Sequence, residues 1–436
     1  MRSRQCGLLS LSLVISLASA QNADHPYRID LPTALQLAKA QNLDVQIARA
    51  RLDEAKANHS AAIAKFLPWI SAGVSFRRHE GRTQAIDGTL VDVDKQSTAY
   101  GPTINAQVDI GDALYSTLAA KQTINATTAG LSAQEQDSSL AAASGYFDLL
   151  KAQALVDVNQ EALKTSETYQ QQISNAVGAG VAFKGDELRV QTQTERFRSN
   201  LVQVQQQQRS AAARLAQQLH LDPSVELVPQ SNELVPLSMI DANATLDSLL
   251  TKAIKASPEL KQGQALAAAA RESKNSTTYG PLIPSIGVQA FLGEFGGGRD
   301  NASGNYAGSK DYFFGVSWRL GPGGLFDFTR IKASNARLHV SELNVDKTID
   351  TIKRQVVDSY SRVKSLSQQI SSSRNSLTAA AETLRLTRER KQLGVGVVLE
   401  DLQAQQELVR ARADYLSVIV DYNKAQYELS KALGAL

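Results

Sequence analysis

Two long regions of the chain carry the heptad pattern of apolar positions that is typical of coiled-coil helices. A stripe in the second half steps alternately by three and four residues, through Leu408, Ala411, Tyr415, Val418, Tyr422, Ala425 and Leu429. Such a period keeps one face of a helix against its neighbours. No proline occurs between Pro102 and Pro223 or after Pro322, so continuous helices are possible there. The stretch from about Ala113 to Ala176 alone would be on the order of 95 Å long.

The pattern of the second half repeats that of the first half. Blocks at 34–45 and 249–260 align, as do Phe66-Leu67-Pro68 and Leu282-Ile283-Pro284, all at an offset of about 215 residues, which indicates an internal duplication. The first-half counterpart of the heptad stripe runs through Thr194, Phe197, Leu201, Val204, Gln208, Ala211 and Leu215. We therefore divide the chain into a signal segment 1–20, a first repeat 21–222, a linker region 223–244 and a second repeat 245–436.

Short segments of alternating polarity precede the long helical regions in both repeats. In the clearest of them, Ile104, Ala106 and Val108 alternate with polar neighbours. This period of two predicts strands of an antiparallel sheet or a barrel wall, at 69–77, 103–111, 285–292 and 312–320. The connecting stretches, 78–99 and 293–311, are rich in Gly, Asp, Asn and Ser and are predicted to be loops. A small soluble sheet packed on the helices is the alternative interpretation.

Four strands are too few to form a transmembrane barrel alone, because single-chain barrels begin at about 8 strands and an open sheet edge in lipid leaves backbone groups unpaired. If the strands cross a membrane, several copies must share one barrel. Three copies would supply 12 strands, and their long helices could wrap the same axis.

The first residues predict export. Arg2 and Arg4 precede an apolar run from Gly7 to Leu17 that closes with Ala18-Ser19-Ala20, which is the pattern of a secretory signal cleaved before Gln21. The single cysteine, Cys6, lies within this segment. The mature protein is thus expected to contain neither a disulfide nor a lipidated cysteine.

Charge and motifs point away from nucleic-acid binding and from catalysis. Removal of the signal takes two arginines from the 46 basic residues, which then nearly balance the 43 acidic ones, so there is no electrostatic footprint for nucleic acid. The histidines, at positions 25, 59, 79, 220 and 339, lack partners at metal-binding spacing. The glycine runs near Gly296 and Gly323 lack the Lys-Ser of a phosphate loop. We expect no enzyme activity, no catalytic residues, no cofactor and no metal.

Several segments together resemble the TolC family of outer-membrane efflux proteins. They are ALQLAKAQNLDVQIARARLDEAKA followed by FLPWISAGVSF, GLFDFTRIKASNARL at Gly324, GVAFKGDELRVQTQ at Gly180 and GVGVVLEDLQAQ at Gly394. The resemblance covers nearly the whole mature chain. It implies a mainly α fold with a small β part: duplicated helical hairpins forming a trimeric α-barrel, a shared 12-stranded outer-membrane β-barrel, and an equatorial region that includes the linker.

The function implied by the resemblance is that of a passive exit duct of a tripartite efflux pump or a type I secretion system. Its partners would be two further copies of the chain, a periplasmic adaptor (membrane fusion) protein, an inner-membrane transporter and outer-membrane lipid. It would lie in the outer membrane with a long periplasmic extension. The exported substrate, whether drug, metal or polypeptide, is not revealed by the sequence, nor are the adaptor and the pump.

In the family, the two turns between the long helices form the periplasmic entrance. The adaptor-contacting tips would be Val177, Gly178, Gly180, Leu393, Gly394 and Gly396. The acids after the turns, Asp186, Glu187, Glu400 and Asp401, would surround a threefold aperture and favour cations, or would only complement the helix dipoles. Asp186 and Glu400 match the family's entrance aspartates, and a further family acid corresponds to Gln403. A closing ion pair would join Lys391 to Asp186.

Two other classes of protein fit parts of the pattern. A secreted structural or adhesive coiled-coil trimer would explain the heptads, although it would not need symmetrically placed strands. A helical binding module of the periplasm would be recovered without detergent, whereas a channel would be recovered as detergent-dependent trimers that conduct ions.

Overall fold

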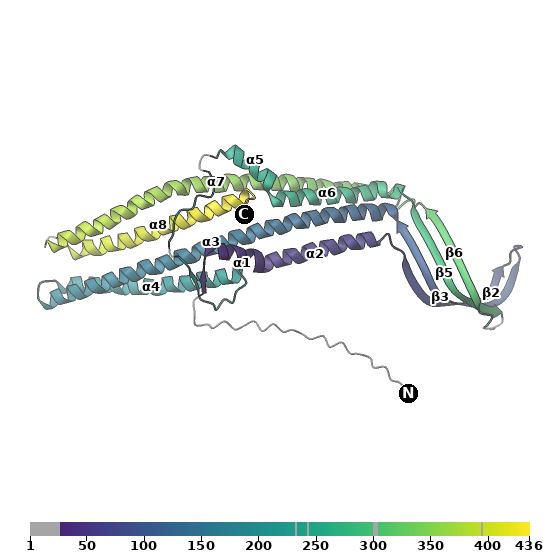
Figure 1. Cartoon of the computed structure of the whole chain (residues 1–436), viewed down its shortest axis with the longest axis horizontal. Helices are drawn as coiled ribbons and strands as arrows, with labels where there is room; N and C mark the ends of the chain where they lie inside the picture. Colours follow the sequence, from purple (N-terminus) through teal and green to yellow (C-terminus); the bar gives the residue numbers. More distant parts are fainter. Residues whose placement is uncertain (1–26, 232, 242–243, 300–303, 394–395) are drawn as a thin grey trace, which may run out of the picture.

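The computed structural model describes residues 27–231, 233–241, 244–299, 304–393 and 396–436. The predicted signal segment, residues 1–20, lies outside the described residues. The molecule is a long bundle of helices with a curved sheet at one end (Figure 1). Within the described ranges, no helix combines the length and the apolarity that crossing a bilayer would demand.

The two halves of the chain contain the same elements in the same order. The first half holds α1 (Leu31–Gln41), α2 (Leu43–Ala64), β2 (Trp69–Gln84), β3 (Leu90–Asp109), α3 (Ile110–Gly178) and α4 (Lys184–Gln218). The second half holds α5 (Leu246–Ala256), α6 (Pro258–Tyr279), η1 (Gly280–Leu282), β5 (Ser285–Arg299), β6 (Ala307–Ser317), α7 (Phe328–Gln392) and α8 (Val398–Ala432). Corresponding helices have nearly equal lengths: α3 has 69 residues and α7 has 65, while α4 and α8 have 35 each. The internally duplicated helical hairpins are thereby confirmed.

Equivalent polar residues begin equivalent helices in the two halves. The Asn42 side chain accepts a hydrogen bond from the Asp44 amide, 2.8 Å, at the start of α2, and Ser257 caps α6 at the amide of Leu260, 3.2 Å. Each cap satisfies an amide that has no partner inside its helix. At the sheet, Asp109 and Asp327 cap the long helices α3 and α7. The positions at which these helices begin are therefore determined by capping residues in the local sequence.

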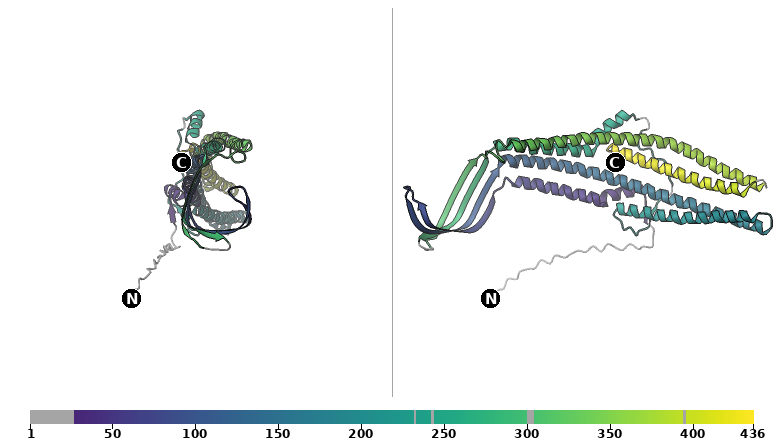
Figure 2. Two further views of the ribbon diagram at one scale, coloured as in Figure 1. Left: turned by 90° about the vertical axis from the view of Figure 1, so that its right-hand side faces the viewer. Right: turned by 180° about the vertical axis from the view of Figure 1, so that it is seen from behind.

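The helices form one curved layer near the sheet and two antiparallel hairpins farther away. Near the sheet the neighbours run in the order α2, α3, α6 and α7, and beyond the middle α4 pairs with α3 and α8 with α7. With 69 residues, α3 extends for roughly 100 Å and joins the sheet to the far end (Figure 2). The predicted heptad stripes are buried or half-buried at every one of their positions in α4 and α8, as a coiled-coil seam requires.

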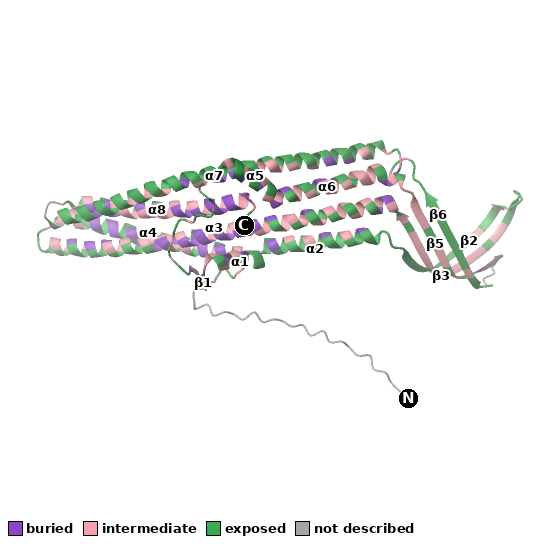
Figure 3. Ribbon diagram, turned by 45° about the horizontal axis from the view of Figure 1, so that its top comes forward, coloured by how far each residue is buried: buried purple, intermediate pink, exposed green. Residues whose placement is uncertain are grey.

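The core is thickest at the middle of the bundle (Figure 3). Small residues of α3 such as Ala142 and Ala143 are fully buried there and let α1, α4 and α8 approach closely. The region 223–241 crosses at this level: its strand β4 (Leu227–Pro229) pairs in parallel with β1 (Tyr27–Ile29). Buried Asn423 of α8 binds the same region twice, through the Leu237 amide at 2.8 Å and the Val235 carbonyl at 2.9 Å.

The four long strands form one antiparallel sheet in the order β2-β3-β5-β6. Their registers are constant, so residues of one parity share a face along the whole sheet. One face carries a band of apolar side chains: Ile70, Val74, Tyr100, Ile104, Val108, Ile286, Val288, Tyr312, Phe314 and Val316. The other face carries polar side chains, Ser71, Asn105, Gln107, Gln289 and Ser317, together with the aromatic side chains of Trp69, Phe291, Phe295 and Phe313.

The strands differ from the predicted ones at their ends. The segments expected to be loops, 78–99 and 293–311, are largely strand, because a hydrogen-bonded ladder between backbones continues past the apolar band whatever the side chains are. Conversely, residues 110–111 are helical, since Asp109 caps α3, and residues 318–320 belong to a turn in which Leu320 is bridged to Leu325. The loop prediction for 78–99 was wrong except at the hairpin tip.

Candidate functional site

The two helix-to-helix turns singled out from the sequence lie at the same end of the molecule, opposite the sheet. The turn between α3 and α4 and the turn between α7 and α8 close the two hairpins there (Figures 1 and 2). This pair of turns, with the side chains packed directly behind them, is the candidate site, and we refer to it as the tip.

The first turn is closed by backbone hydrogen bonds that need glycine. The amide of Gly180 donates to the Val177 carbonyl and that of Val181 to the Ala176 carbonyl, both at 2.9 Å. This is a Schellman closure, in which the residue after the helix is left-handed. Gly180 adopts φ +76°, a conformation that costs glycine little. The sharp reversal of the chain is thus set by Gly180, as the sequence predicted.

The second turn needs glycine for a different reason. A Cβ added at Gly396 would lie 2.7 Å from the Cα of Lys391, so a side chain would collide with the end of α7. Leu393, directly after α7, is 79% exposed. Gly394 lies outside the described residues.

Apolar side chains project from both turns into solvent. Besides Leu393, the exposed residues are Val181, Phe183 and Val397, of which Phe183 and Val397 immediately precede α4 and α8. All four of these side chains are more than half exposed in the single chain. The sequence analysis did not single out these three residues, although large apolar side chains beside turn glycines were visible in it.

Three of the four predicted entrance acids lie at the surface of the tip, each beside a basic residue of its own hairpin. Asp186 pairs with Arg189 at 3.3 Å and Glu400 with Arg390 at 3.3 Å. Glu187 accepts hydrogen bonds from Lys184 and from the Ser174 hydroxyl, and these bonds lower the pKa of its carboxyl, with Lys184 the larger cause. Gln403, at the position of a further family acid, is exposed.

The fourth acid, Asp401, is buried between the hairpins and is only 2% exposed. Gln405 donates a hydrogen bond to its Oδ2 atom, 2.8 Å, and the Arg388 guanidinium lies 3.8 Å from its Oδ1 atom. In the single chain this carboxylate therefore does not line an open aperture. The Oδ1 atom has no hydrogen-bond partner among the described residues, and the Arg388 guanidinium of α7 faces it only at ion-pair distance.

Tyr169 of α3 connects the two hairpins at the tip. Its ring is 6% exposed and packs with Val190 of α4 and Leu402 of α8. The ammonium of Lys391 lies 3.6 Å from the ring centroid, a cation–π contact. Burial, followed by the negative charges of Asp401 and Asp186, raises the pKa of the Tyr169 phenol, which therefore stays neutral. Tyr169 could not be singled out from the sequence, because its contacts with α8 and with Lys391 arise only when the two hairpins pack together.

The ion pair expected between Lys391 and Asp186 is not formed within the described protomer. Asp186 binds Arg189 of its own helix, and Lys391 lies over the Tyr169 ring instead. Burial lowers the pKa of the Lys391 ammonium, and the Asp401 carboxylate opposes that shift. Lys391 thus packs on the face of the Tyr169 ring, and Asp401 is the acid that acts on its charge there.

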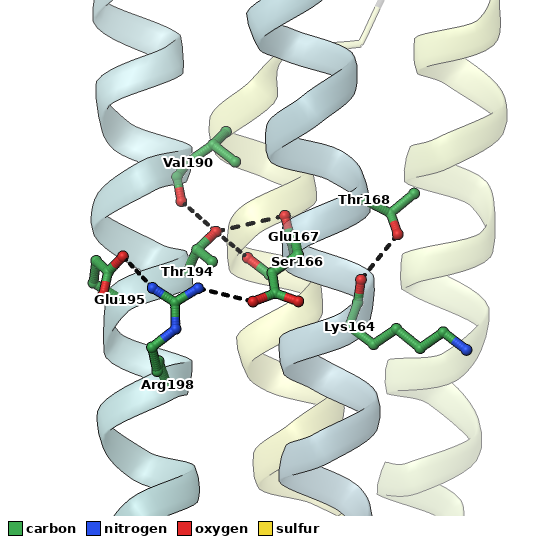
Figure 4. A network of polar contacts seen from close by, with 8 residues as sticks. All are labelled: Lys164, Ser166, Glu167, Thr168, Val190, Thr194, Glu195 and Arg198. Carbon is green, nitrogen blue, oxygen red and sulfur yellow. Dashed lines mark hydrogen bonds and ion pairs between the residues drawn. The ribbon is translucent and has the colours of Figure 1, made fainter.

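Behind the tip, buried hydroxyls join α3 to α4 (Figure 4). The Ser166 and Thr194 hydroxyls are 2.9 Å apart and fully buried, and Thr194 also donates to the Val190 carbonyl at 3.0 Å. Beside them, Arg198 of α4 reaches Glu167 of α3 at 2.8 Å. Polar contacts of this kind in a coiled-coil seam fix the register of the two helices.

Thr194→Val is expected to destabilise the α3–α4 hairpin by about 1 to 2 kcal/mol, because it leaves the buried Ser166 hydroxyl without its partner while keeping the side-chain shape. Thermal unfolding followed by circular dichroism in detergent measures the effect. Thr192→Val is the control, since the hydroxyl of Thr192 is exposed and bonds only the Leu188 carbonyl. Equal melting temperatures for the two variants would contradict a structural role for the buried hydroxyl pair.

Within the part of the chain that the structure describes, no group of three or more His, Cys, Asp or Glu side chains is placed to hold a metal ion.

Comparison with known proteins gives matches along almost the whole chain. The sequence profile described as "Outer membrane efflux protein" matches residues 34–219 and 249–435. The chain is 22% identical over 428 residues to the toluene efflux pump outer membrane protein TtgC of Pseudomonas putida, covering 93% of this chain and 82% of TtgC. It is 25% identical over 159 residues to the outer membrane efflux protein BepC of Brucella suis, covering 36% of this chain and 34% of BepC.

The fold matches a solved membrane protein from Pseudomonas aeruginosa. The TM-score is 0.78 at 19% sequence identity, and the match covers 93% of each chain. Each of the two segments that the sequence profile matches covers most of one copy of the duplicated unit.

Proposed function

Since the chain belongs to the outer membrane efflux protein family, a family of passive channels of the outer membrane, we propose that three copies form the exit duct of a tripartite efflux pump or a type I secretion system. The observation that carries this proposal is the four-stranded sheet with one apolar face and two open edges. We also propose that residues 1–20 are removed as a signal and that repeats 21–222 and 245–436 flank an equatorial region at 223–244.

The geometry of the sheet supports a barrel shared by several copies. Strands β2 and β6 are its edges, and each presents unpaired backbone groups on one side. In lipid such groups must be paired, and the β6 edge of one copy can pair with the β2 edge of the next. Three copies of the four-stranded sheet then close a 12-stranded barrel. This arrangement leaves no strand edge exposed to lipid.

The height of the apolar band agrees with this proposal. On β3 it runs from Tyr100 to Val108, about 27 Å along the strand, which corresponds to roughly 20 Å of height for a strand tilted by about 40°. An outer-membrane barrel has an apolar band about 25 Å tall and polar side chains inside. The polar face, which carries Asn105, Gln107 and Gln289, would line the lumen.

The helical part would continue the duct into the periplasm. Exposed apolar side chains remain along the two outer helices of the layer, among them Ile47 and Ile63 of α2 and Val340 and Leu343 of α7. In a trimer, α7 of one copy would lie beside α2 of the next, because the helices follow the strands to which they are joined. Assembly would bury these side chains, which favours a closed tunnel.

At the tip, we propose an entrance and a docking surface. Asp186, Glu187 and Glu400 from three copies would surround the aperture, while Lys391, Asp401 and Gln403 lie behind or beside them. The turns with Val177, Gly178, Gly180, Leu393, Gly394 and Gly396 would meet a periplasmic adaptor, which links the duct to an inner-membrane transporter. The exposed apolar residues at both turns support this role.

The test is reconstitution of the mature full-length protein. We expect trimers that depend on detergent, begin at Gln21 by mass spectrometry, and conduct ions in planar lipid bilayers. A monomer that stays soluble and folded in plain buffer would reject the channel. A detergent-free trimer without conductance would instead support the adhesive coiled-coil stalk.

A further inference from the structure

Four basic side chains gather on one face of the sheet, at its end farthest from the helices. His79 of β2, Lys95 of β3 and Arg299 of β5 lie directly opposite one another in register. Arg77 lies on the same face, two residues nearer the helices. Neighbouring strands are about 4.8 Å apart, so these side chains form a compact group, which we call the basic row.

Like charges that face each other across strands destabilise a sheet, and the basic row has no acid to offset this cost among the described residues. No carboxylate of the described chain lies within 4.0 Å of Arg77, Lys95 or Arg299. The nearest acid that the register places on the same face is Asp311, opposite Phe291, which is eight residues from Arg299 along β5, or about 26 Å.

On the opposite face of the same strands, by contrast, the arginines are paired with acids. There Arg78 pairs with Asp94 at 3.3 Å and also with Glu80, and Arg82 pairs with Asp92 at 3.6 Å. Acids outnumber arginines among these five side chains. The charge of the basic row is therefore a property of one face and not of the hairpin as a whole.

The basic row also contains an unsatisfied polar atom. The Nε2 atom of His79 is shielded from solvent and has no hydrogen-bond partner among the described residues. The Arg77, Lys95 and Arg299 side chains beside it are exposed. If the exposed side chains around it move aside to hold an anion, an oxygen atom of that anion can supply the missing partner.

The face of the basic row is the polar one that carries Asn105, Gln107 and Gln289 nearer the helices, because the registers stay constant along the sheet. In the barrel described under the proposed function, on which this step rests, that face lines the lumen. Three copies would place three such rows around the outer mouth. A ring of cationic side chains in a confined opening attracts anions and repels cations.

We propose that the basic row is an anion-binding site at the exit of the duct, which admits and briefly holds solutes that bear phosphate or carboxylate groups. Arg77, Lys95 and Arg299 supply the charge, and His79 supplies a hydrogen-bonding nitrogen. The site acts on solutes at the end of their passage, at the opposite end of the molecule from the acids of the tip.

The test compares two double variants that each remove two positive charges from the end of the sheet farthest from the helices. Lys95→Gln/Arg299→Gln changes the basic row, and Arg78→Gln/Arg82→Gln changes the opposite face. Tripolyphosphate binding is measured by calorimetry on the detergent-solubilised full-length trimer. We expect the Kd to rise at least about tenfold in the first variant and less than about twofold in the second.

Planar-bilayer recordings give a second measurement. In a KCl gradient, the reversal potential of the Lys95→Gln/Arg299→Gln channel should shift toward that of potassium, and block by tripolyphosphate should weaken by the same factor as binding. Equal effects of the two double variants would overturn the anion site, since surface charge alone would then explain binding. Absence of conductance in the wild-type protein would instead refute the channel, while calorimetry would still decide whether the site exists.

Discussion

Single channels of the Tyr169→Ala variant are expected to be open far more often than those of the wild-type protein. Tyr169 is the side chain through which α3 meets the α7–α8 hairpin at the tip, by packing on Leu402 and by carrying the Lys391 ammonium. A shielded cation–π contact contributes about 2 kcal/mol. If this contact holds the entrance closed, its loss raises the ratio of open to closed channels about 30-fold.

The matched control is Tyr169→Phe. The phenol oxygen of Tyr169 is buried and has no hydrogen-bond partner within the described chain, so the ring alone makes the contacts that matter. Tyr169→Phe should therefore conduct like the wild-type protein, and Lys391→Ala should change conduction in the same direction as Tyr169→Ala. Open probabilities from planar-bilayer recordings decide the point. If Tyr169→Ala leaves the open probability unchanged, contacts between protomers and not within one protomer close the entrance.

Gly111→Ala is expected to destabilise the junction between the sheet and the helices by about 3 kcal/mol. Gly111 is buried in the first turn of α3, where the chain leaves β3. An added Cβ would overlap the carbonyl oxygen of Gly280 and lie 2.7 Å from its carbonyl carbon. Both partners are backbone, which cannot rotate away as a side chain could. The clash therefore pushes α3 away from the end of α6.

Thermal unfolding of the purified protein and the yield of trimers in detergent measure this effect. Gly178→Ala is the control, because Gly178 is also helical and a Cβ there meets nothing within 4 Å. That substitution should be neutral or slightly stabilising, as alanine is a better helix former than glycine. Equal trimer yields and melting temperatures for the two variants would show that the junction tolerates a wider spacing.

The helical part of the fold was predictable because its signals are local. The long helix expected from about 113 to 176 extends from Ile110 to Gly178, since its length depends on the absence of proline and on the caps at Asp109 and Gly180. The ends of the strands were not predictable in the same way. Beyond the apolar band the residues on both faces of the sheet are mainly polar, so alternation of polarity no longer indicates a strand. The backbone hydrogen bonds between β2 and β3 nevertheless continue to the hairpin tip.

At the tip, the turns and the surface acids could be found from the sequence, whereas the packing behind them could not. Asp186 and Glu400 follow glycine-bearing turns directly, and a turn is defined by neighbours in the chain. Tyr169, Arg388 and Asp401 meet only because α3, α7 and α8 pack together. For that reason the contact of Lys391 with Tyr169 within one protomer was not expected from the sequence.

The sequence by itself determined the duplication, the helical period and the four strands of the long sheet, because each of these is a repeat carried by consecutive residues, whereas the short pair of β1 and β4 was not visible in it. Only the tertiary structure decided which side chains from distant segments share a surface, such as Tyr169 with Lys391 at the tip and His79 with Lys95 and Arg299 on the sheet. Register between strands and spacing between helices arise from packing along the whole length of the molecule, and no short stretch of sequence carries that information.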